Sequence, residues 1–229
     1  MKEVSVNGFT ALRFGSGEGA RKQAGKVLYV LCFDREGAEK TGKRLAPLCQ
    51  TICVFKEDGD FSPWEGESLW PEEEWNGGAG DLLRALENSL IPAAEKEWHL
   101  DVRSRMLAGY SLAGLCAMYA GYVTEAFDAF ACVSGSLWYE GWLDFASSHQ
   151  LNSKDAAVYV SVGVKEKNTR NERMAKVEEC MEAYVQILKQ QQSARPVLFE
   201  LNPGTHFTDP EGRVLKAAKW MLENAKNGG

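Results

Sequence analysis

Short apolar runs alternate along this chain with longer segments whose apolar residues recur at helical spacing. Apolar runs bounded by glycine, proline and polar residues are typical of strands buried on both faces of a sheet. From Val27 onward strand and helix alternate, which favours parallel pairing with helices on both faces. We therefore predict an α/β fold with a mostly parallel central sheet. The expected strands cover residues 27–33, 50–55, 106–109, 129–133, 156–162 and 196–201, and the expected helices cover residues 37–46, 80–97, 115–122, 138–147, 171–191 and 214–224.

Other segments give weaker patterns. Residues 3–14 alternate weakly and suit an edge strand, and residues 15–25 form a glycine-rich polar turn region. Pro92 is expected to break or kink the helix that contains it. Residues 56–78 lack periodicity, yet their three tryptophans argue against disorder, so we expect an ordered loop with a function. Because no repeat, low-complexity tract or linker divides the chain, we expect a single domain over residues 1–229.

The stretch Gly109-Tyr110-Ser111-Leu112-Ala113-Gly114 lies between an expected strand and an expected helix. A serine flanked by small residues at such a junction is typical of a nucleophile elbow, a tight and strained turn that exposes the hydroxyl. The usual pattern is G-x-S-x-G; here Ala113 takes the second small position, and alanine is small enough. We predict that Ser111 is a nucleophile and that the N–H of Leu112 contributes to an oxyanion hole.

A serine hydroxyl needs a base within hydrogen-bond reach, and three histidines are available: His99, His149 and His206. In open α/β sheets, reactive groups collect at the carboxyl ends of the strands. His99 precedes the strand that leads to Ser111, which places it near the opposite edge. His149 ends a polar segment. His206 follows the last strand, as Ser111 follows its own, so His206 is the predicted base.

The acid that orients the base is expected between Ser111 and His206 in the chain. The strand at residues 156–162 ends at Gly163, and Glu166 is the carboxylate nearest that end. It would accept a hydrogen bond from the histidine, fix its tautomer and stabilise the imidazolium. An exposed glutamate among lysines is the competing interpretation. Asp144 is a weaker candidate because it lies one strand too early, and Asp209 fits poorly because it follows the histidine.

Further residues are expected around the nucleophile. The second oxyanion donor should come from the loop after the first buried strand, near Phe33 and Asp34. Trp138 and Tyr139 follow another strand end and are candidates for the wall of a substrate pocket, although a tryptophan is more often a core residue. Trp64 and Trp70, on the long loop, are candidates for covering the site.

Composition limits the classes of partner. The net charge of −6 argues against nucleic acid. No segment has the roughly 20 apolar residues that span a membrane, and no signal-peptide pattern opens the chain, so we expect a cytoplasmic protein. The six cysteines show no C-x-x-C pair and no zinc spacing, and we expect neither a metal nor another cofactor. The sequence leaves the oligomeric state open.

The chain contains three separated motifs, in residues 107–115, residues 133–139 and residues 204–207. Together they resemble the putative esterase family of the α/β-hydrolase superfamily, which includes esterase D-like enzymes and the siderophore trilactone esterases. The resemblance runs from about Val27 to the C-terminus. It implies an α/β-hydrolase fold and a serine hydrolase that acts on esters, with Ser111 as nucleophile and His206 as base. In that family an acid often follows the glycine that ends the seventh strand; here Val164 stands there and Glu166 is nearby.

The predicted function is therefore cleavage of a small-molecule carboxylic ester through an acyl-enzyme. A Ser–His pair without the third member is an alternative arrangement, because some trilactone esterases are described in that way. A long inserted cap has no room, and an open site is expected. The alternative functions are acyl transfer to an acceptor other than water and a catalytically silent binding protein on the same fold.

Overall fold

The computed structural model describes residues 2–15, 17–69 and 74–226. Its centre is an eight-stranded sheet with the order β1-β2-β4-β3-β7-β8-β9-β10. The pairs from β4 to β10 are parallel, and β2 pairs antiparallel with both β1 and β4. The strands of this sheet are β1 (Lys2–Val6), β2 (Phe9–Phe14), β3 (Lys26–Leu31), β4 (Gln50–Phe55), β7 (Ser104–Tyr110), β8 (Ala129–Val133), β9 (Ala156–Gly163) and β10 (Ala194–Asn202).

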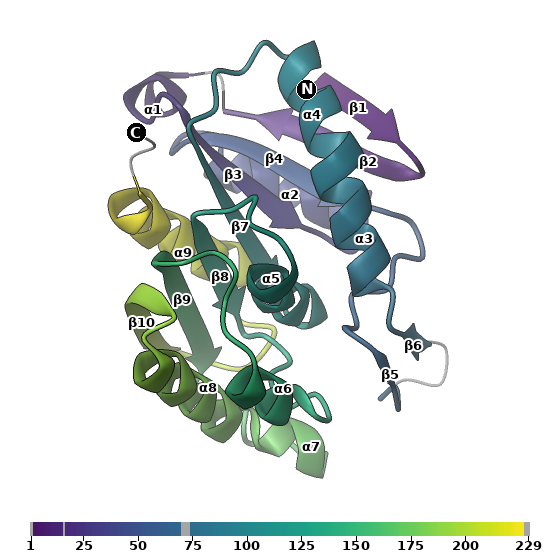
Figure 1. Cartoon of the computed structure of the whole chain (residues 1–229), viewed down its shortest axis with the longest axis vertical. Coiled ribbons are helices and arrows are strands. Elements are labelled where there is room, and N and C mark those ends of the chain that lie inside the picture. The colour runs from purple at the N-terminus through teal and green to yellow at the C-terminus, as the bar shows by residue number, and fades with distance from the viewer. Residues whose placement is uncertain (1, 16, 70–73, 227–229) are drawn as a thin grey trace.

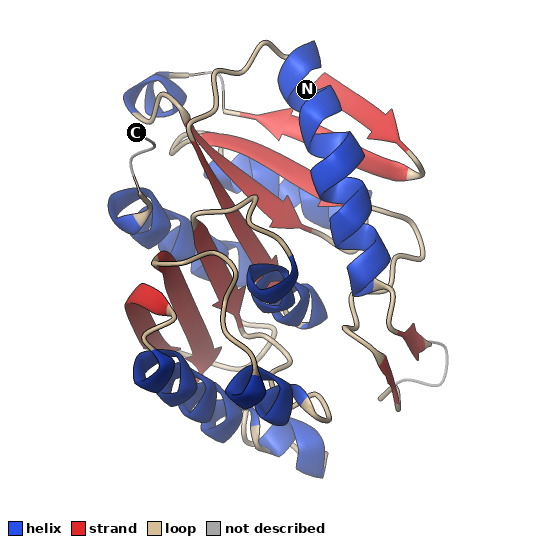
Figure 2. Ribbon diagram, viewed as in Figure 1, coloured by secondary structure: helices blue, strands red, loops and turns tan. Residues whose placement is uncertain are grey.

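Helices cover both faces of this sheet (Figures 1 and 2). On one face, the strands pack against α2 (Arg35–Leu45) and α9 (Pro210–Asn224), and on the other against the remaining long helices. The mostly parallel α/β architecture predicted from the alternation of strand and helix is therefore confirmed. The second face carries α3 (Ala79–Ala85), the π-helix η1 (Leu86–Leu90), α4 (Ile91–Glu97), α5 (Leu112–Val123), α6 (Trp142–Ser148) and α8 (Val177–Gln191).

The N-terminal segment differs from the prediction. Residues 3–14 do not form one edge strand; they form the hairpin of β1 and β2, which turns at Asn7 and Gly8. Both turn residues have positive φ, 52° and 79°, as the tight hairpin turn of an Asn-Gly pair requires. The glycine-rich region that follows contains a short helix, α1 (Glu18–Lys22), instead of turns throughout.

Two long helices are also more divided than their periodicity indicates. The segment with helical periodicity over residues 80–97, where a break or kink is expected at Pro92, passes from α3 through η1 into α4. The π-helical turn ends at Leu90, two residues before Pro92, and helical structure continues across the proline. Since proline cannot donate the main-chain hydrogen bond, a wider turn before it is a physically reasonable way to continue the helix. The segment predicted as one helix over residues 171–191 is split into α7 (Glu172–Ala175) and α8.

The long loop of residues 56–78 contains little secondary structure. Within residues 56–78, β5 (Glu65–Gly66) and β6 (Trp75–Asn76) pair as a small hairpin; Trp70 lies outside the described residues.

Strand β8 and helix α6 are joined by residues 134–141 alone, so no large cap domain is inserted there, as predicted. None of the helices in the described part of the chain has the length and apolar character to cross a membrane.

Candidate active site

Ser111 occupies the sharp turn between β7 and α5, near the centre of the sheet. Its backbone angles, φ 57° and ψ −127°, are unfavourable for a residue with a side chain and are the kind of strain expected of an elbow. The turn is fixed on both sides: the Ser111 N–H donates to the carbonyl of Val133 at 3.1 Å, and the Ser111 carbonyl accepts from the N–H of Ser136 at 3.1 Å. The strained residue is therefore held by the neighbouring strand β8 and the loop after it.

Small residues around the elbow allow main-chain segments to approach each other. A Cβ on Gly109 would lie 2.0 Å from the carbonyl oxygen of Ala113, and one on Gly114 would lie 3.0 Å from the carbonyl oxygen of Gly109. The close contact thus involves the main chain of Ala113, whose methyl group is buried in the core. This explains why alanine serves at the position where G-x-S-x-G has its second glycine.

His206 lies in the turn between β10 and α9. Its main-chain carbonyl accepts a hydrogen bond from the hydroxyl of Tyr110, the residue before Ser111, and the Tyr110 and His206 rings are 5.2 Å apart. The segment is also tied to the end of β9, because the N–H of Lys165 donates to the carbonyl of Gly204 at 3.0 Å. The turns after β7, β9 and β10 are therefore joined to one another.

Glu166 turns back toward the end of β9 and contacts His206. The Nδ1 of His206 and the Oε2 of Glu166 are 2.8 Å apart, and the Glu166 side chain is 3% exposed. The other carboxylate oxygen accepts from the N–H of Gly163 at 2.6 Å and from the hydroxyl of Ser134 at 2.8 Å. Glu166 is thus a buried, fully hydrogen-bonded carboxylate, not an exposed residue among lysines.

The surroundings of Glu166 favour its ionised form. Burial alone raises the pKa of this carboxyl, but hydrogen bonds from the His206 ring, the Gly163 N–H and the Ser134 hydroxyl outweigh burial, so the pKa lies below its ordinary value. A carboxylate that is ionised and hydrogen-bonded to Nδ1 holds the neutral imidazole with its proton on that nitrogen. The Nε2 of His206 is then free to accept a proton.

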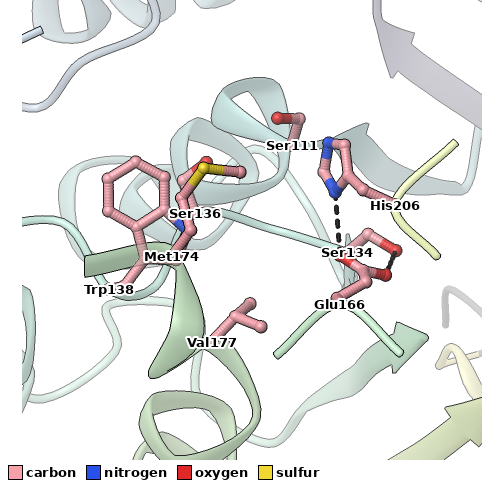
Figure 3. A pocket seen from close by; sticks show the side chains of 8 residues that line it. All are labelled: Ser111, Ser134, Ser136, Trp138, Glu166, Met174, Val177 and His206. Carbon is pink, nitrogen blue, oxygen red and sulfur yellow. Dashed lines mark hydrogen bonds and ion pairs between the residues drawn. The ribbon is translucent and has the colours of Figure 1, made fainter. Parts of the chain in front are cut away.

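Ser111 and His206 line the same small hollow (Figure 3). In the described chain no hydrogen bond joins their side chains; in enzymes without substrate this contact is often long and shortens on binding. The hollow has a volume of about 20 Å³, close to that of a single water molecule. Its lining also includes Ser136 and Trp138, from the segment after β8 that was expected to border the pocket, and three residues that sequence reasoning missed: Ser134, Met174 and Val177.

A second, larger hollow of about 470 Å³ is lined by Leu112, the residue after Ser111, and by Phe33, among other residues. Leu112 is the first residue of α5, so its N–H has no partner within the helix. Phe33 is 48% exposed and packs its ring edge against Phe61. Asp34, the other residue predicted near the second oxyanion donor, caps α2 with its side chain: its carboxylate accepts from the N–H of Gly37 at 2.7 Å.

Two of the predicted pocket residues lie elsewhere. Tyr139 is buried and donates its hydroxyl to the carbonyl of Trp64 at 2.7 Å, while the Trp64 indole N–H donates to the carbonyl of Glu140 at 3.0 Å. Their rings are 6.0 Å apart, and neither residue lines the two hollows beside Ser111. The half-buried Trp64 and the buried Tyr139 therefore pack on each other, and their role as walls of a substrate pocket stays a prediction.

The buried Arg213 on α9 is a further residue that sequence reasoning missed. Its guanidinium donates to the Oε1 of Glu166 at 2.6 Å and to the hydroxyl of Ser134 at 2.7 Å. A signal was present in the sequence: Arg213 shares a helical face with Ala217 and Met221, both fully buried. A charged residue at a core position of an amphipathic helix indicates a buried partner.

The competing candidates are occupied in other ways. His149 stacks on Phe145 with a centroid distance of 4.3 Å, and His99 lies beside the starts of β3 and β7, away from the elbow. Asp144 is exposed on α6, and Asp209 caps α9 by accepting from the N–H of Gly212. Across the described residues, no group of three His, Cys, Asp or Glu side chains could hold a metal ion.

A mostly parallel sheet with a strained serine turn at its centre and a histidine after its last strand defines the α/β-hydrolase class. Residues 22–206 match the family model described as "Putative esterase". Because this match covers most of the chain, the protein belongs to that esterase family.

Individual relatives agree with this assignment at the level of the fold. The IroE-like serine hydrolase from Shewanella oneidensis superimposes with a TM-score of 0.72 at 18% identity, covering 97% of this chain and 79% of that one. The siderophore hydrolase EstB from Aspergillus nidulans gives a TM-score of 0.72 at 15% identity, covering 97% and 94%. The uncharacterized protein YbbA of Bacillus subtilis is 32% identical over 111 residues, which are 47% of this chain and 44% of that protein, so the match spans less than half of its length.

Proposed function

We propose that this member of the family cleaves a small-molecule carboxylic ester through an acyl-enzyme intermediate, with Ser111 as nucleophile, His206 as general base and Glu166 as the acid that orients the base. The observation that carries the proposal is the buried contact between Glu166 and His206 at 2.8 Å, on the same hollow that Ser111 lines. A neutral imidazole held in this way is the arrangement that accepts a proton from a serine hydroxyl.

In the first half of the reaction, the Ser111 oxygen attacks the ester carbonyl while Nε2 of His206 takes the hydroxyl proton. Negative charge develops on the carbonyl oxygen, and the N–H of Leu112 and an N–H near Phe33 are the donors expected to stabilise it; each such donor contributes about 3–4 kcal/mol. Glu166 stabilises the imidazolium. His206 then protonates the leaving alcohol, and the acyl group remains on Ser111.

In the second half, a water molecule replaces the alcohol. His206 takes a proton from the water as it attacks the acyl carbonyl, and returns that proton to the Ser111 oxygen as the acid product leaves. Acyl transfer to an alcohol would follow the same steps with the alcohol in place of water. Comparing the products formed with and without an added alcohol separates hydrolysis from transfer.

A fluorophosphonate probe tests the proposal directly, because it forms a covalent bond only with an activated serine. We expect the native protein to gain one adduct at Ser111, and Ser111→Ala to gain none and to lose nearly all turnover while its binding of ester remains. Ser136→Ala is the matched control, since Ser136 lines the same hollow. The proposal would be refuted if the native protein neither reacted with the probe nor hydrolysed any of a panel of nitrophenyl esters and a cyclic trilactone. The remaining alternative would then be a catalytically silent binding protein on the same fold.

A further inference from the structure

Arg213 is the buried cation that joins the acid to the segment carrying the base. Its side chain is 3% exposed. One terminal nitrogen, Nη1, donates to the Oε1 of Glu166 at 2.6 Å and to the Ser134 hydroxyl at 2.7 Å. The other, Nη2, donates to the carbonyl of Pro203 at 2.9 Å and to that of Thr205 at 2.7 Å. The same guanidinium therefore holds Glu166 and the turn that ends in His206.

The carboxylate divides its two oxygens between the cation and the base. Oε1 accepts from Arg213 and Oε2 accepts from the ring of His206. A planar guanidinium with donors in a fixed fork can satisfy a carboxylate and main-chain carbonyls at once, which a lysine ammonium cannot do in the same geometry. Rotation of Glu166 away from His206 would break the contact with Arg213, so Arg213 limits the orientation of the acid.

Gly163 packs closely against this contact. A Cβ on Gly163 would lie 2.6 Å from Nη2 of Arg213 and 2.9 Å from the Oε1 of Glu166. Removing a buried charge while its partner stays leaves an uncompensated ion in the protein interior. Loss of Arg213 would thus disturb the Glu166 anion itself, beyond any loss of packing.

We propose that Arg213 is a positioning residue for ester cleavage: it holds Glu166 aimed at Nδ1 of His206, and it fixes the main chain before His206 at the distance that this contact requires. This inference rests on the proposed function, because it assigns a role toward the base of that reaction. Arg213 itself is not required to touch substrate. Ser134, which donates to the same carboxylate oxygen and accepts from Arg213, completes the arrangement.

The test compares the native protein with Arg213→Met and Arg213→Lys in steady-state ester hydrolysis over a range of pH. Lys216→Met is the matched control, because Lys216 is a cation on the same helix that pairs with Glu200 and is half exposed. For Arg213→Met we expect kcat to fall by on the order of 100-fold with KM within about threefold, since a misaligned base slows chemistry more than binding. Arg213→Lys should recover part of kcat.

The pH profile separates positioning from a structural role. Without the cation, Glu166 should take up a proton at higher pH, so the acid limb of kcat/KM should move upward by about one pH unit or more for Arg213→Met. In Arg213→Lys, which keeps the positive charge, the acid limb of kcat/KM should lie close to its pH in the native protein. The rate of fluorophosphonate labelling should follow the same order, and Lys216→Met should match the native protein in every measurement.

A double-mutant cycle with Glu166→Gln gives the second readout. If Arg213 acts through Glu166, adding Arg213→Met to Glu166→Gln should cost less than about tenfold in kcat, because the two changes remove the same arrangement. An equal loss in both backgrounds, or an unmoved acid limb, would overturn the inference. If Arg213→Met does not fold, Arg213→Lys decides: native kcat in that variant would also overturn it. If the native protein reacts with the fluorophosphonate and hydrolyses esters, and the Arg213 variants do so equally well, only the positioning role is refuted. If the native protein does neither, the proposed function itself is refuted.

Discussion

Glu166 and His206 share a buried hydrogen bond of 2.8 Å although the exposed Val164 occupies the position directly after the strand-ending glycine. The turn after β9 accounts for this: the N–H of Glu166 donates to the carbonyl of Gly163 at 2.9 Å, and the side chain folds back over the same residue. The extra length of glutamate, together with the turn, brings a carboxylate to a point that Val164 cannot supply.

Glu166→Gln is expected to lower kcat by about 10³- to 10⁴-fold, because an amide in this place no longer fixes the tautomer of His206 or stabilises its cation. The measurement is steady-state hydrolysis of a nitrophenyl ester, with circular dichroism to verify folding. Glu172→Gln, at an exposed position of α7, is the control and should retain native kcat. Retention of more than a tenth of native kcat by Glu166→Gln would favour a Ser–His pair acting without an acid.

The ionised state of Glu166 should also appear in the pH dependence of stability. Its pKa in the folded protein lies below the ordinary value of 4.5, so the folded state binds fewer protons than the unfolded state in the range between the two pKa values. The stability from this group is therefore complete above about pH 4.5 and is lost as the pH falls through the folded pKa. Urea unfolding of the native protein and Glu166→Gln across this range should show their difference changing with pH; a constant difference would contradict the prediction.

The structure of the turn around Ser111 predicts that a substitution at Gly109 is poorly tolerated, whereas a substitution at Ala113 is well tolerated. Gly109→Ala places a methyl group 2.0 Å from the carbonyl of Ala113, and we expect a loss of at least about 1–3 kcal/mol in the free energy of unfolding together with loss of fluorophosphonate labelling. Ala113→Gly should cost about 1 kcal/mol, the price of glycine in a helix, and should keep the labelling. Equal effects of the two changes on urea unfolding and labelling would show that the main-chain contact does not limit the turn.

Met174 should restrict the group that enters the small hollow beside Ser111. Because that hollow has a volume of about 20 Å³, truncating Met174 opens space for additional methylene groups. We expect Met174→Ala to raise kcat/KM for longer acyl chains relative to acetate by about 10-fold or more per well-placed methylene, as hydrophobic pockets discriminate by this amount. A series of nitrophenyl esters measures the ratio, with Glu172→Ala on the same helix as control. An unchanged ratio would place the acyl chain elsewhere, in the larger hollow beside Phe33.

The sequence was sufficient for the parts of the molecule that depend on local pattern. Apolar runs identified the parallel strands, and the order of strands led to Ser111, Glu166 and His206, of which the last two are in contact. It was insufficient where the partner of a residue comes from a distant element. Arg213 is the main example, because its function in the fold is set by contacts with β8, β9 and the turn after β10.

Local features were also missed where two signals compete. The Asn7–Gly8 pair is a hairpin signal, but the weak alternation around it reads equally well as one strand. The orientation of Trp64 and Tyr139 cannot be read from position alone, because Trp64 lies on the long loop and Tyr139 follows a strand end. The sequence does not show that their rings pack on each other.

The direct path from β8 to α6 through residues 134–141 has a kinetic consequence. A hinged flap over the serine would have to open before an ester could bind, and an aggregated apolar substrate could favour the open form. With no such flap inserted at this point of the chain, the rate should rise smoothly with the amount of dissolved ester and show no jump at the concentration where the ester aggregates.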